Sequence, residues 1–287
     1  MNFIKEKELS HEEYVNALTE NSHGITECEG DYRTADENKI LICGKCGTPK
    51  EYVYKYQDGS GKERRCAIRC KCDDIAEAEY RQRKAKEKFD DRVKRLRAKG
   101  IASKRYLECT FAKDDGSNPK ITAECKRYVE HWDEIKASDT GALFYGSVGT
   151  GKSFFAACIA NALIDKGVPV HIATLSELVR LRTANYGKDD INLDKFDLLI
   201  IDDLGVENAS PTAYSIIDER YNSKKPLIVT TNLTPSELKN PKTQEQKRIY
   251  DRVLELCGGV AIRIDGNSKR VEVAKQKREI ANSIFNS

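Results

Sequence analysis

One short segment limits the fold of this 287-residue chain more than any other. Residues 146–153 read Gly-Ser-Val-Gly-Thr-Gly-Lys-Ser and match the pattern G-x-x-x-x-G-K-[ST]. An apolar strand is predicted to end at Tyr145 and a helix to begin at Ser153, which is the context that the pattern requires. A plain turn between a strand and a helix needs no lysine at the helix start. The segment therefore predicts a phosphate-binding loop inside an α/β fold.

The residue types of this loop explain how it would bind phosphate. The loop comprises Gly146, Ser147, Val148, Gly149, Thr150, Gly151, Lys152 and Ser153. Its glycines let the backbone curl so that successive N–H groups face inward, and the helix N-terminus adds the positive end of its dipole. Lys152 is expected to reach the β- and γ-phosphates of a nucleotide, and the Ser153 hydroxyl is expected to bind Mg²⁺.

A second apolar segment is predicted to carry acidic side chains to the same edge of the sheet. Residues 196–201 predict a buried strand, and Asp202 and Asp203 follow it. Open α/β sheets bind ligands at the carboxyl ends of their strands. We expect Asp202 to hold Mg²⁺, directly or through water, and Asp203 to polarise an attacking water. The alternative is that both form a turn, whereas Asp197 starts the strand and is excluded.

Three further polar residues could complete such a site. Asn232 ends a predicted buried strand and could orient the nucleophile, or it could cap a helix that begins near Pro235. Arg252 lies on a predicted helix, and Arg270 follows a turn at residues 266–268. Either arginine could stabilise charge on a transferring phosphoryl group, and the alternative for both is a surface ion pair.

Strands and helices alternate from Tyr106 onward. Strands are expected at residues 142–145, 170–174, 196–201, 227–231, 260–264 and 270–273, with helices at 153–166, 175–183, 211–222 and 243–257 and a helical pattern from Ile121 to Ile135. This alternation predicts a parallel sheet flanked by helices.

Cysteine spacing points to a metal near the N-terminus. Five of the ten cysteines lie between Cys43 and Cys72. Residues 1–10 lack the apolar stretch of a signal peptide, so a disulfide framework is not expected. Four thiolates drawn from the pair Cys43/Cys46 and the group Cys66, Cys70 and Cys72 would suit tetrahedral Zn²⁺. A reduced hairpin without metal and an iron–sulfur cluster stay open as alternatives.

Composition divides the chain into three parts. Residues 80–105 hold 12 Lys/Arg and 3 Asp/Glu, which predicts a charged helix that either connects two parts or contacts nucleic acid. The whole chain carries a net charge of +3, which favours neither reading. We expect a helical and metal-binding module at 1–75, starting with a helix at about residues 10–20, then a basic helical linker at 76–105 and an ATPase domain at 106–287. The longest apolar run, near residues 154–164, is too short to span a membrane, so no membrane partner is expected.

The order of five motifs carries a resemblance to a known family. GSVGTGKS, LLIIDDLG, IVTTN, RIYDRV and GNSKR follow one another over roughly residues 105–275. This order resembles the AAA+ P-loop NTPase domain of DnaC/DnaI-type replicative helicase loaders, to which the IstB-like transposition ATPases are related. The resemblance implies that residues 146–153 are the Walker A loop and that Asp202 and Asp203 are the Walker B pair, with ATP and Mg²⁺ as cofactors.

The same resemblance implies roles for residues nearer the C-terminus. Asn232 matches sensor 1, and Arg252 matches the arginine finger that acts on ATP held by a neighbouring subunit, which implies a head-to-tail oligomer. Arg270 matches sensor 2, with Lys269 as the alternative. Residues 106–111 resemble the segment that lines the adenine pocket, where Phe111 would pack near the base.

The resemblance finally implies a function and a choice of zinc ligands. Loaders of this type often end their N-terminal zinc module in a Cys-x-Cys pair, which favours Cys43, Cys46, Cys70 and Cys72, with Cys66 as a substitute. The implied function is a cytoplasmic ATPase that loads a hexameric replicative helicase onto single-stranded DNA, with the N-terminal module binding the helicase. The alternatives are a transposition ATPase that acts on a transposase and DNA, and a nucleotide-gated DNA-binding adaptor.

Overall fold

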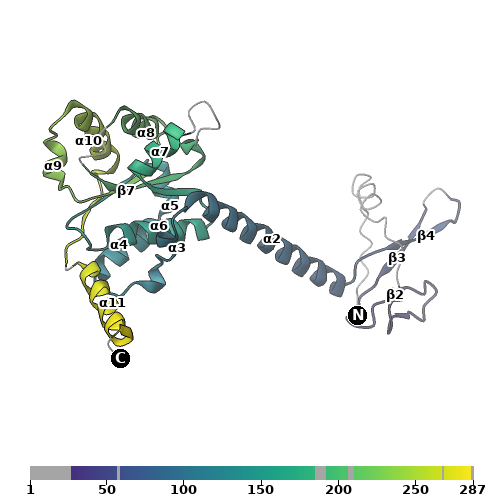
Figure 1. Ribbon diagram of the computed structural model, residues 1–287. Coiled ribbons are helices and arrows are strands. Elements are labelled where there is room, and N and C mark those ends of the chain that lie inside the picture. The colour runs from purple at the N-terminus through teal and green to yellow at the C-terminus, as the bar shows by residue number, and fades with distance from the viewer. Residues whose placement is uncertain (1–26, 57–58, 185–191, 206–209, 267, 286–287) are drawn as a thin grey trace. The chain divides into compact units, whose positions relative to one another are not determined.

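The computed structural model describes residues 27–56, 59–184, 192–205, 210–266 and 268–285. The chain divides into two compact units, Met1–Lys88 and Phe89–Ser287 (Figure 1). The helix expected at residues 10–20 lies outside the described residues. Within the described part of the chain, no helix combines the length and apolar character that crossing a membrane would require.

The first unit contains two small antiparallel sheets. Its strands are β1 (Tyr32–Arg33), β2 (Leu41–Ile42), β3 (Glu51–Lys55) and β4 (Glu63–Ala67). β1 pairs with β2, and β3 pairs with β4 as the predicted hairpin. The long helix α2 (Lys71–Gly100) begins in this unit and ends in the second one.

Ion pairs rather than aliphatic side chains fill much of the interior of the first unit. Lys50 and Asp31 form a 2.7 Å ion pair whose side chains are 10% and 4% exposed. The buried carboxylate of Glu51 pairs with both Arg33 and Arg65 at 2.7 Å. Removing charges from water offsets most of the attraction in such pairs. The hydrophobic support of this unit is therefore small.

The second unit is built on a parallel sheet. Its strands are β5 (Ala142–Tyr145), β6 (Val170–Thr174), β7 (Leu198–Leu204), β8 (Leu227–Thr231) and β9 (Ala261–Arg263). They lie in the order β6-β7-β8-β5-β9, and all neighbours pair in parallel. The strands are nearly continuously apolar because helices cover both faces of the sheet.

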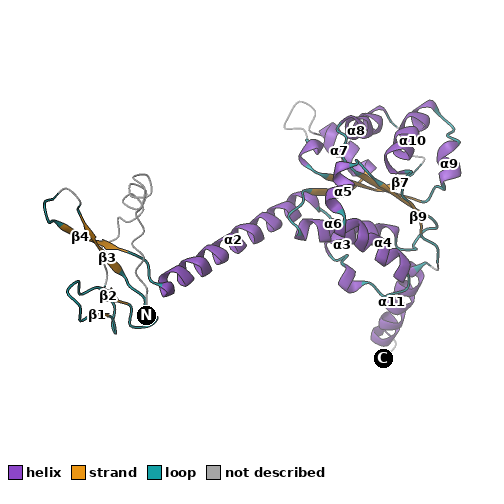
Figure 2. Cartoon of the chain, turned by 180° about the vertical axis from the view of Figure 1, so that it is seen from behind, coloured by secondary structure: helices purple, strands orange, loops and turns teal. Residues whose placement is uncertain are grey.

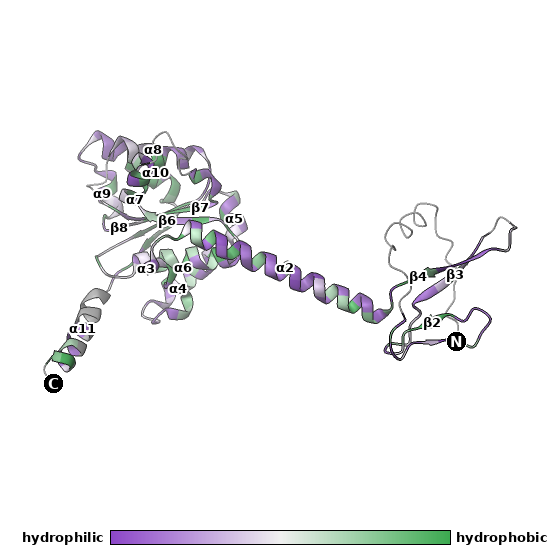
Figure 3. Ribbon diagram, turned by 45° about the vertical axis from the view of Figure 1, so that its right-hand side comes forward, coloured by the Kyte–Doolittle hydropathy of each residue, from purple (hydrophilic) through white to green (hydrophobic). Residues whose placement is uncertain are grey.

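Helices form a layer on each side of this sheet (Figure 2). The helices are α3 (Lys104–Leu107), η1 (Phe111–Lys113), α4 (Pro119–Glu130), α5 (Trp132–Ala137), α6 (Lys152–Asp165), α7 (Leu175–Ala184), η2 (Leu193–Lys195), α8 (Pro211–Asn222), α9 (Pro235–Lys239), α10 (Gln244–Cys257) and α11 (Lys269–Phe285). α4 and α6 pack on the face to which Phe144 points, and α7, α8 and α10 pack on the face to which Leu143 points. Hydrophobic residues accordingly gather in the sheet and on α6 (Figure 3).

The last turns of α2 pack on the second unit. Val93 and Leu96 contact its hydrophobic core, and Arg97 binds Asn161 on α6. A Cβ atom on Gly100 would lie 1.9 Å from the carbonyl oxygen of Val170, so only glycine fits at this point. Part of the segment expected as a linker therefore contributes to the core of the second unit. The division into three functional parts stays a prediction.

Two predicted elements differ from the structure. Residues 270–273 were expected as a strand, but they belong to helix α11. Their alternating pattern of polar residues and valines resembles a strand, yet the strong helix formers that follow at residues 274–277 continue one helix through the segment. Strand β7 also runs past Ile201 to Leu204, with an irregularity between these residues. The acidic pair therefore lies within the strand, and the plain turn that was its alternative is wrong.

Candidate nucleotide-binding site

The glycine-rich loop connects the end of β5 to the start of α6. Gly146, Gly149 and Gly151 have φ angles of 137°, 83° and 104°, which residues with a Cβ atom rarely adopt. At Gly146 a Cβ atom would also lie 2.3 Å from the carbonyl oxygen of Ile264. The glycines thus permit a backbone path that other residues would disturb.

The Lys152 ammonium lies across this loop. Its Nζ donates to the carbonyl oxygens of Gly146 at 2.9 Å and Ser147 at 2.6 Å, and the residue is 7% exposed. The loop therefore holds a positive charge at its centre, beside the start of a helix. Both features attract phosphate oxygens.

One cavity collects most of the residues that the sequence singled out. It is lined by Arg105, Val148, Gly149, Gly151, Lys152, Ser153, Phe154, Asp202, Asp203, Thr230 and Asn232. The loop, β7 and the end of β8 meet there because β7 and β8 are neighbours and β8 also pairs with β5. Phe111 does not line this cavity, in contrast to the expected adenine contact; it packs against the core beside Lys126.

Asp202 is the most enclosed acid of the cavity. It is 1% exposed, and Thr230 Oγ1 donates to its Oδ1 at 2.6 Å. Its Oδ2 accepts from the Tyr106 hydroxyl at 2.7 Å and from Arg105 Nη2 at 3.0 Å. Burial raises the pKa of Tyr106, which keeps its hydroxyl a donor. The Ser153 hydroxyl and the Asp202 carboxylate supply the oxygen ligands that Mg²⁺ prefers, so the donor set fits this ion.

Asp203 projects from an irregular point of β7. It has a φ of 60° and is exposed, and its backbone N–H donates to Thr230 Oγ1 at 2.9 Å. Asn232 Nδ2 lies 3.4 Å from Asp203 Oδ1, so these two side chains are adjacent. The alternative role of Asn232 as a helix cap is wrong, because Thr234 caps α9 in a capping box with Glu237.

The two predicted arginines lie outside the described lining of the cavity. Arg252 on α10 donates from Nε to Asp218 Oδ1 at 2.6 Å, and its guanidinium lies 5.0 Å and 5.1 Å from the ring centres of Tyr214 and Tyr221. The backbone of Arg270 belongs to α11, and its side chain lies outside the described part. The start of this helix is nevertheless close to the loop, since a Cβ atom on Gly149 would lie 2.1 Å from Ser268 Oγ.

Sequence reasoning missed three residues of the site. Thr230 lies two positions before Asn232 on the same strand, so the period of two places both side chains on one face and could have indicated it. Tyr106 was expected near the adenine, but its hydroxyl binds Asp202. Arg105 reaches Asp202 across 97 residues of sequence, and no spacing indicated that contact.

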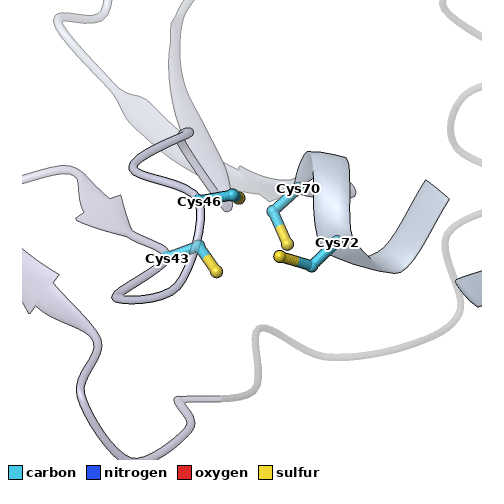
Figure 4. A group of neighbouring side chains, drawn as sticks. All are labelled: Cys43, Cys46, Cys70 and Cys72. Atoms are coloured by element: carbon cyan, nitrogen blue, oxygen red, sulfur yellow. The ribbon is translucent and has the colours of Figure 1, made fainter. Parts of the chain in front are cut away.

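The four favoured cysteines of the first unit form a separate group. The Sγ atoms of Cys43, Cys46, Cys70 and Cys72 all lie within 4.8 Å of one another (Figure 4). A tetrahedral zinc site has Zn–S bonds of about 2.3 Å and sulfur separations of about 3.8 Å, so the set fits Zn²⁺. Cys66 lies on β4 outside this group.

Local interactions prepare these thiols differently. A hydrogen bond with Thr48 lowers the pKa of Cys46 to about 5, whereas burial raises the pKa of Cys70 to about 12. Gly47, with a φ of 68°, closes the turn between Cys43 and Thr48. A bound cation would favour the thiolate of each cysteine.

The parallel sheet, the glycine-rich loop and the acidic pair on a neighbouring strand define an AAA+ nucleotide-binding domain. A family model described as IstB-like ATP binding protein matches residues 65–279. This match covers more than half of the chain, which therefore belongs to the IstB-like ATP-binding protein family.

Relatives of known name lie among helicase loaders. The chain is 27% identical over 217 residues to the replicative helicase loader DnaI of Bacillus subtilis (strain 168), covering 67% of this chain and 68% of DnaI. It is 31% identical over 164 residues to the replicative helicase loader DnaC of Buchnera aphidicola subsp. Schizaphis graminum (strain Sg), covering 52% of this chain and 64% of that protein. The chain thus spans less than two thirds of that DnaC.

A solved structure is similar to the second unit in fold. A candidate primosome component from Streptococcus pyogenes serotype M3 has 22% sequence identity and a TM-score of 0.50, covering 59% of this chain and 92% of that one. At this identity the likeness concerns the fold alone.

Proposed function

We propose that this protein is an ATP-dependent replication factor that binds a hexameric replicative helicase and loads it onto single-stranded DNA. The observation that carries the proposal is the convergence of Lys152, Ser153, Asp202, Asp203 and Asn232 on one cavity. Two relatives named replicative helicase loaders support the biological role. ATP binding and hydrolysis would control the complex with the helicase.

In this proposal the residues of the cavity divide the work of ATP hydrolysis. Lys152 binds the β- and γ-phosphates. Ser153 and Asp202 hold Mg²⁺, which when bound neutralises charge on the phosphates. Asp203 accepts a hydrogen bond from the attacking water and takes its proton, and Asn232, adjacent to Asp203, orients the same water.

Two arginines would add positive charge at the transferring phosphoryl group. Arg252 acts as an arginine finger on ATP bound by a neighbouring copy, so the complete site requires a head-to-tail oligomer. Arg270 acts as sensor 2 within its own subunit, which the position of Ser268 beside Gly149 supports. Lys269 is the alternative residue for this second role.

The first unit would form the contact with the helicase. Zn²⁺ held by Cys43, Cys46, Cys70 and Cys72 would stabilise this small unit, whose interior is rich in ion pairs. Exposed basic side chains of α2 and of the second unit are the candidates for contact with the DNA backbone.

Nucleotide binding tests the cavity directly. Lys152→Ala should abolish ATP binding measured by calorimetry with Mg²⁺, because it removes the charge at the centre of the loop. Lys120→Ala is the matched control, since Lys120 is an exposed lysine on α4. Equal affinity of Lys152→Ala and the wild-type protein would refute the site.

Capture of a replicative helicase tests the biological role. A pull-down with the whole chain should recover the helicase, and a chain lacking residues 1–75 should not. Capture of a transposase in place of the helicase would favour the transposition ATPase. DNA binding gated by ATP without hydrolysis or helicase binding would favour the adaptor.

A further inference from the structure

We propose that Arg105 is a further residue of the nucleotide site and competes with Mg²⁺ for Asp202. This inference rests on the proposed function, because it concerns the same cavity. Arg105 comes from helix α3, which precedes the glycine-rich loop in the chain, and its side chain lines the cavity. Its Nη2 lies 3.0 Å from Asp202 Oδ2.

The partners of Asp202 differ in their freedom to leave. Thr230 and Tyr106 donate neutral hydroxyl groups and are 1% and 2% exposed, so both belong to the packed interior. Arg105 supplies a cation, and its side chain is 58% exposed. Arg105 is therefore the partner that can withdraw from the carboxylate without repacking the core.

A guanidinium and a divalent cation exclude each other at one carboxylate oxygen. Two positive charges on Oδ2 would repel within a few ångströms, at a residue almost wholly removed from water. Coordination by Asp202 Oδ2 therefore requires Arg105 to move away. The loss of the Arg105 contact opposes Mg²⁺ binding, so the ion must be present at a higher concentration than Asp202 alone would demand.

The surroundings of Arg105 keep it within reach of the cavity. Its guanidinium carbon lies 4.4 Å from the centre of the Tyr106 ring, and its Nη2 also donates to the Tyr106 hydroxyl. Asn161 on α6 donates to the backbone carbonyl oxygens of Tyr106 and Cys109 at 2.8 Å and fixes this segment. The contact with Asp202 can therefore break and re-form while the backbone stays in place.

The test is a Mg²⁺ titration of the full chain with a fluorescent ATP analogue carrying an N-methylanthraniloyl group. Arg105→Ala should lower the Mg²⁺ concentration at half-maximal nucleotide binding by about three- to tenfold, the range expected for loss of a partly exposed ion pair. Arg105→Gln should act in the same direction. Arg105→Lys keeps the charge and should stay close to the wild-type midpoint.

Lys104→Ala is the matched control, because Lys104 is the neighbouring exposed cation on α3 and no contact with Asp202 involves it. An equal shift in Lys104→Ala would show a general field effect and overturn the proposal. An unchanged or higher midpoint in both Arg105→Ala and Arg105→Gln, with nucleotide still bound, would overturn it as well. Failure of the wild-type protein to bind nucleotide at any Mg²⁺ concentration would instead refute the proposed function, and this inference with it.

Discussion

Asn161 links the nucleotide site to the stability of the second unit. This residue of α6 is 1% exposed, and its Nδ2 donates to the carbonyl oxygens of Tyr106, Cys109 and Ala157 at 2.8, 2.8 and 3.0 Å. Its Oδ1 accepts from Arg97 on α2. One amide thus joins α6, α2 and the segment that carries Arg105.

Replacing Asn161 with alanine leaves those carbonyl groups without their donor. A buried acceptor without a partner costs about 1–3 kcal/mol, and the better helix propensity of alanine returns about 0.6 kcal/mol. With two carbonyls outside α6 affected, the expected loss is about 2–4 kcal/mol. For a unit of roughly 200 residues this corresponds to a fall in Tm of about 5–15 °C.

Thermal unfolding followed by circular dichroism measures this effect. Asn161→Asp should destabilise the protein at least as much, because a carboxylate would face carbonyl oxygens. Asp165→Ala is the control, since Asp165 also pairs with Arg97 but is 62% exposed, and it should cost less than about 1 kcal/mol. A Tm for Asn161→Ala within 1 °C of the Asp165→Ala value would refute the reasoning.

Three further predictions concern other parts of the molecule. Cys70→Ser should remove zinc detected by elemental analysis, whereas Cys66→Ser should retain it; the reverse result would change the ligand set. Burial lowers the pKa of His171, so protonation favours the unfolded chain, and stability should be complete well above about pH 6.5 and fall as the pH drops below that value. His171→Leu should flatten this dependence of Tm, and parallel curves would contradict it. Arg252→Ala should bind ATP but hydrolyse it poorly, and mixing it with Lys152→Ala should restore part of the rate; no rescue at any ratio would argue against a shared site.

Local patterns predicted much of the fold. Continuous apolar runs marked the central strands, and the β3–β4 hairpin followed from alternation around a turn. Residues 270–273 misled because four residues cannot distinguish a strand from the first turn of a helix. The extension of β7 through Asp203 was also missed, since a single residue with positive φ inside a strand leaves no mark in hydrophobicity.

The site divides in the same way. The loop and the acidic pair are encoded by short contiguous motifs, so their positions in the sequence could be found directly. The contacts of Arg105 and Tyr106 with Asp202 depend on how distant segments pack, and pattern reading cannot supply that. The environment of Arg252, made by residues of α8, was hidden for the same reason.

That environment has a consequence for how copies of the chain would assemble. A free arginine side chain loses rotational freedom worth about 1.5–2 kcal/mol when a partner immobilises it. Asp218, Tyr214 and Tyr221 already restrict Arg252 in the isolated chain. The entropic penalty therefore falls on folding rather than on docking, and a second copy would meet a guanidinium that is ordered before it arrives.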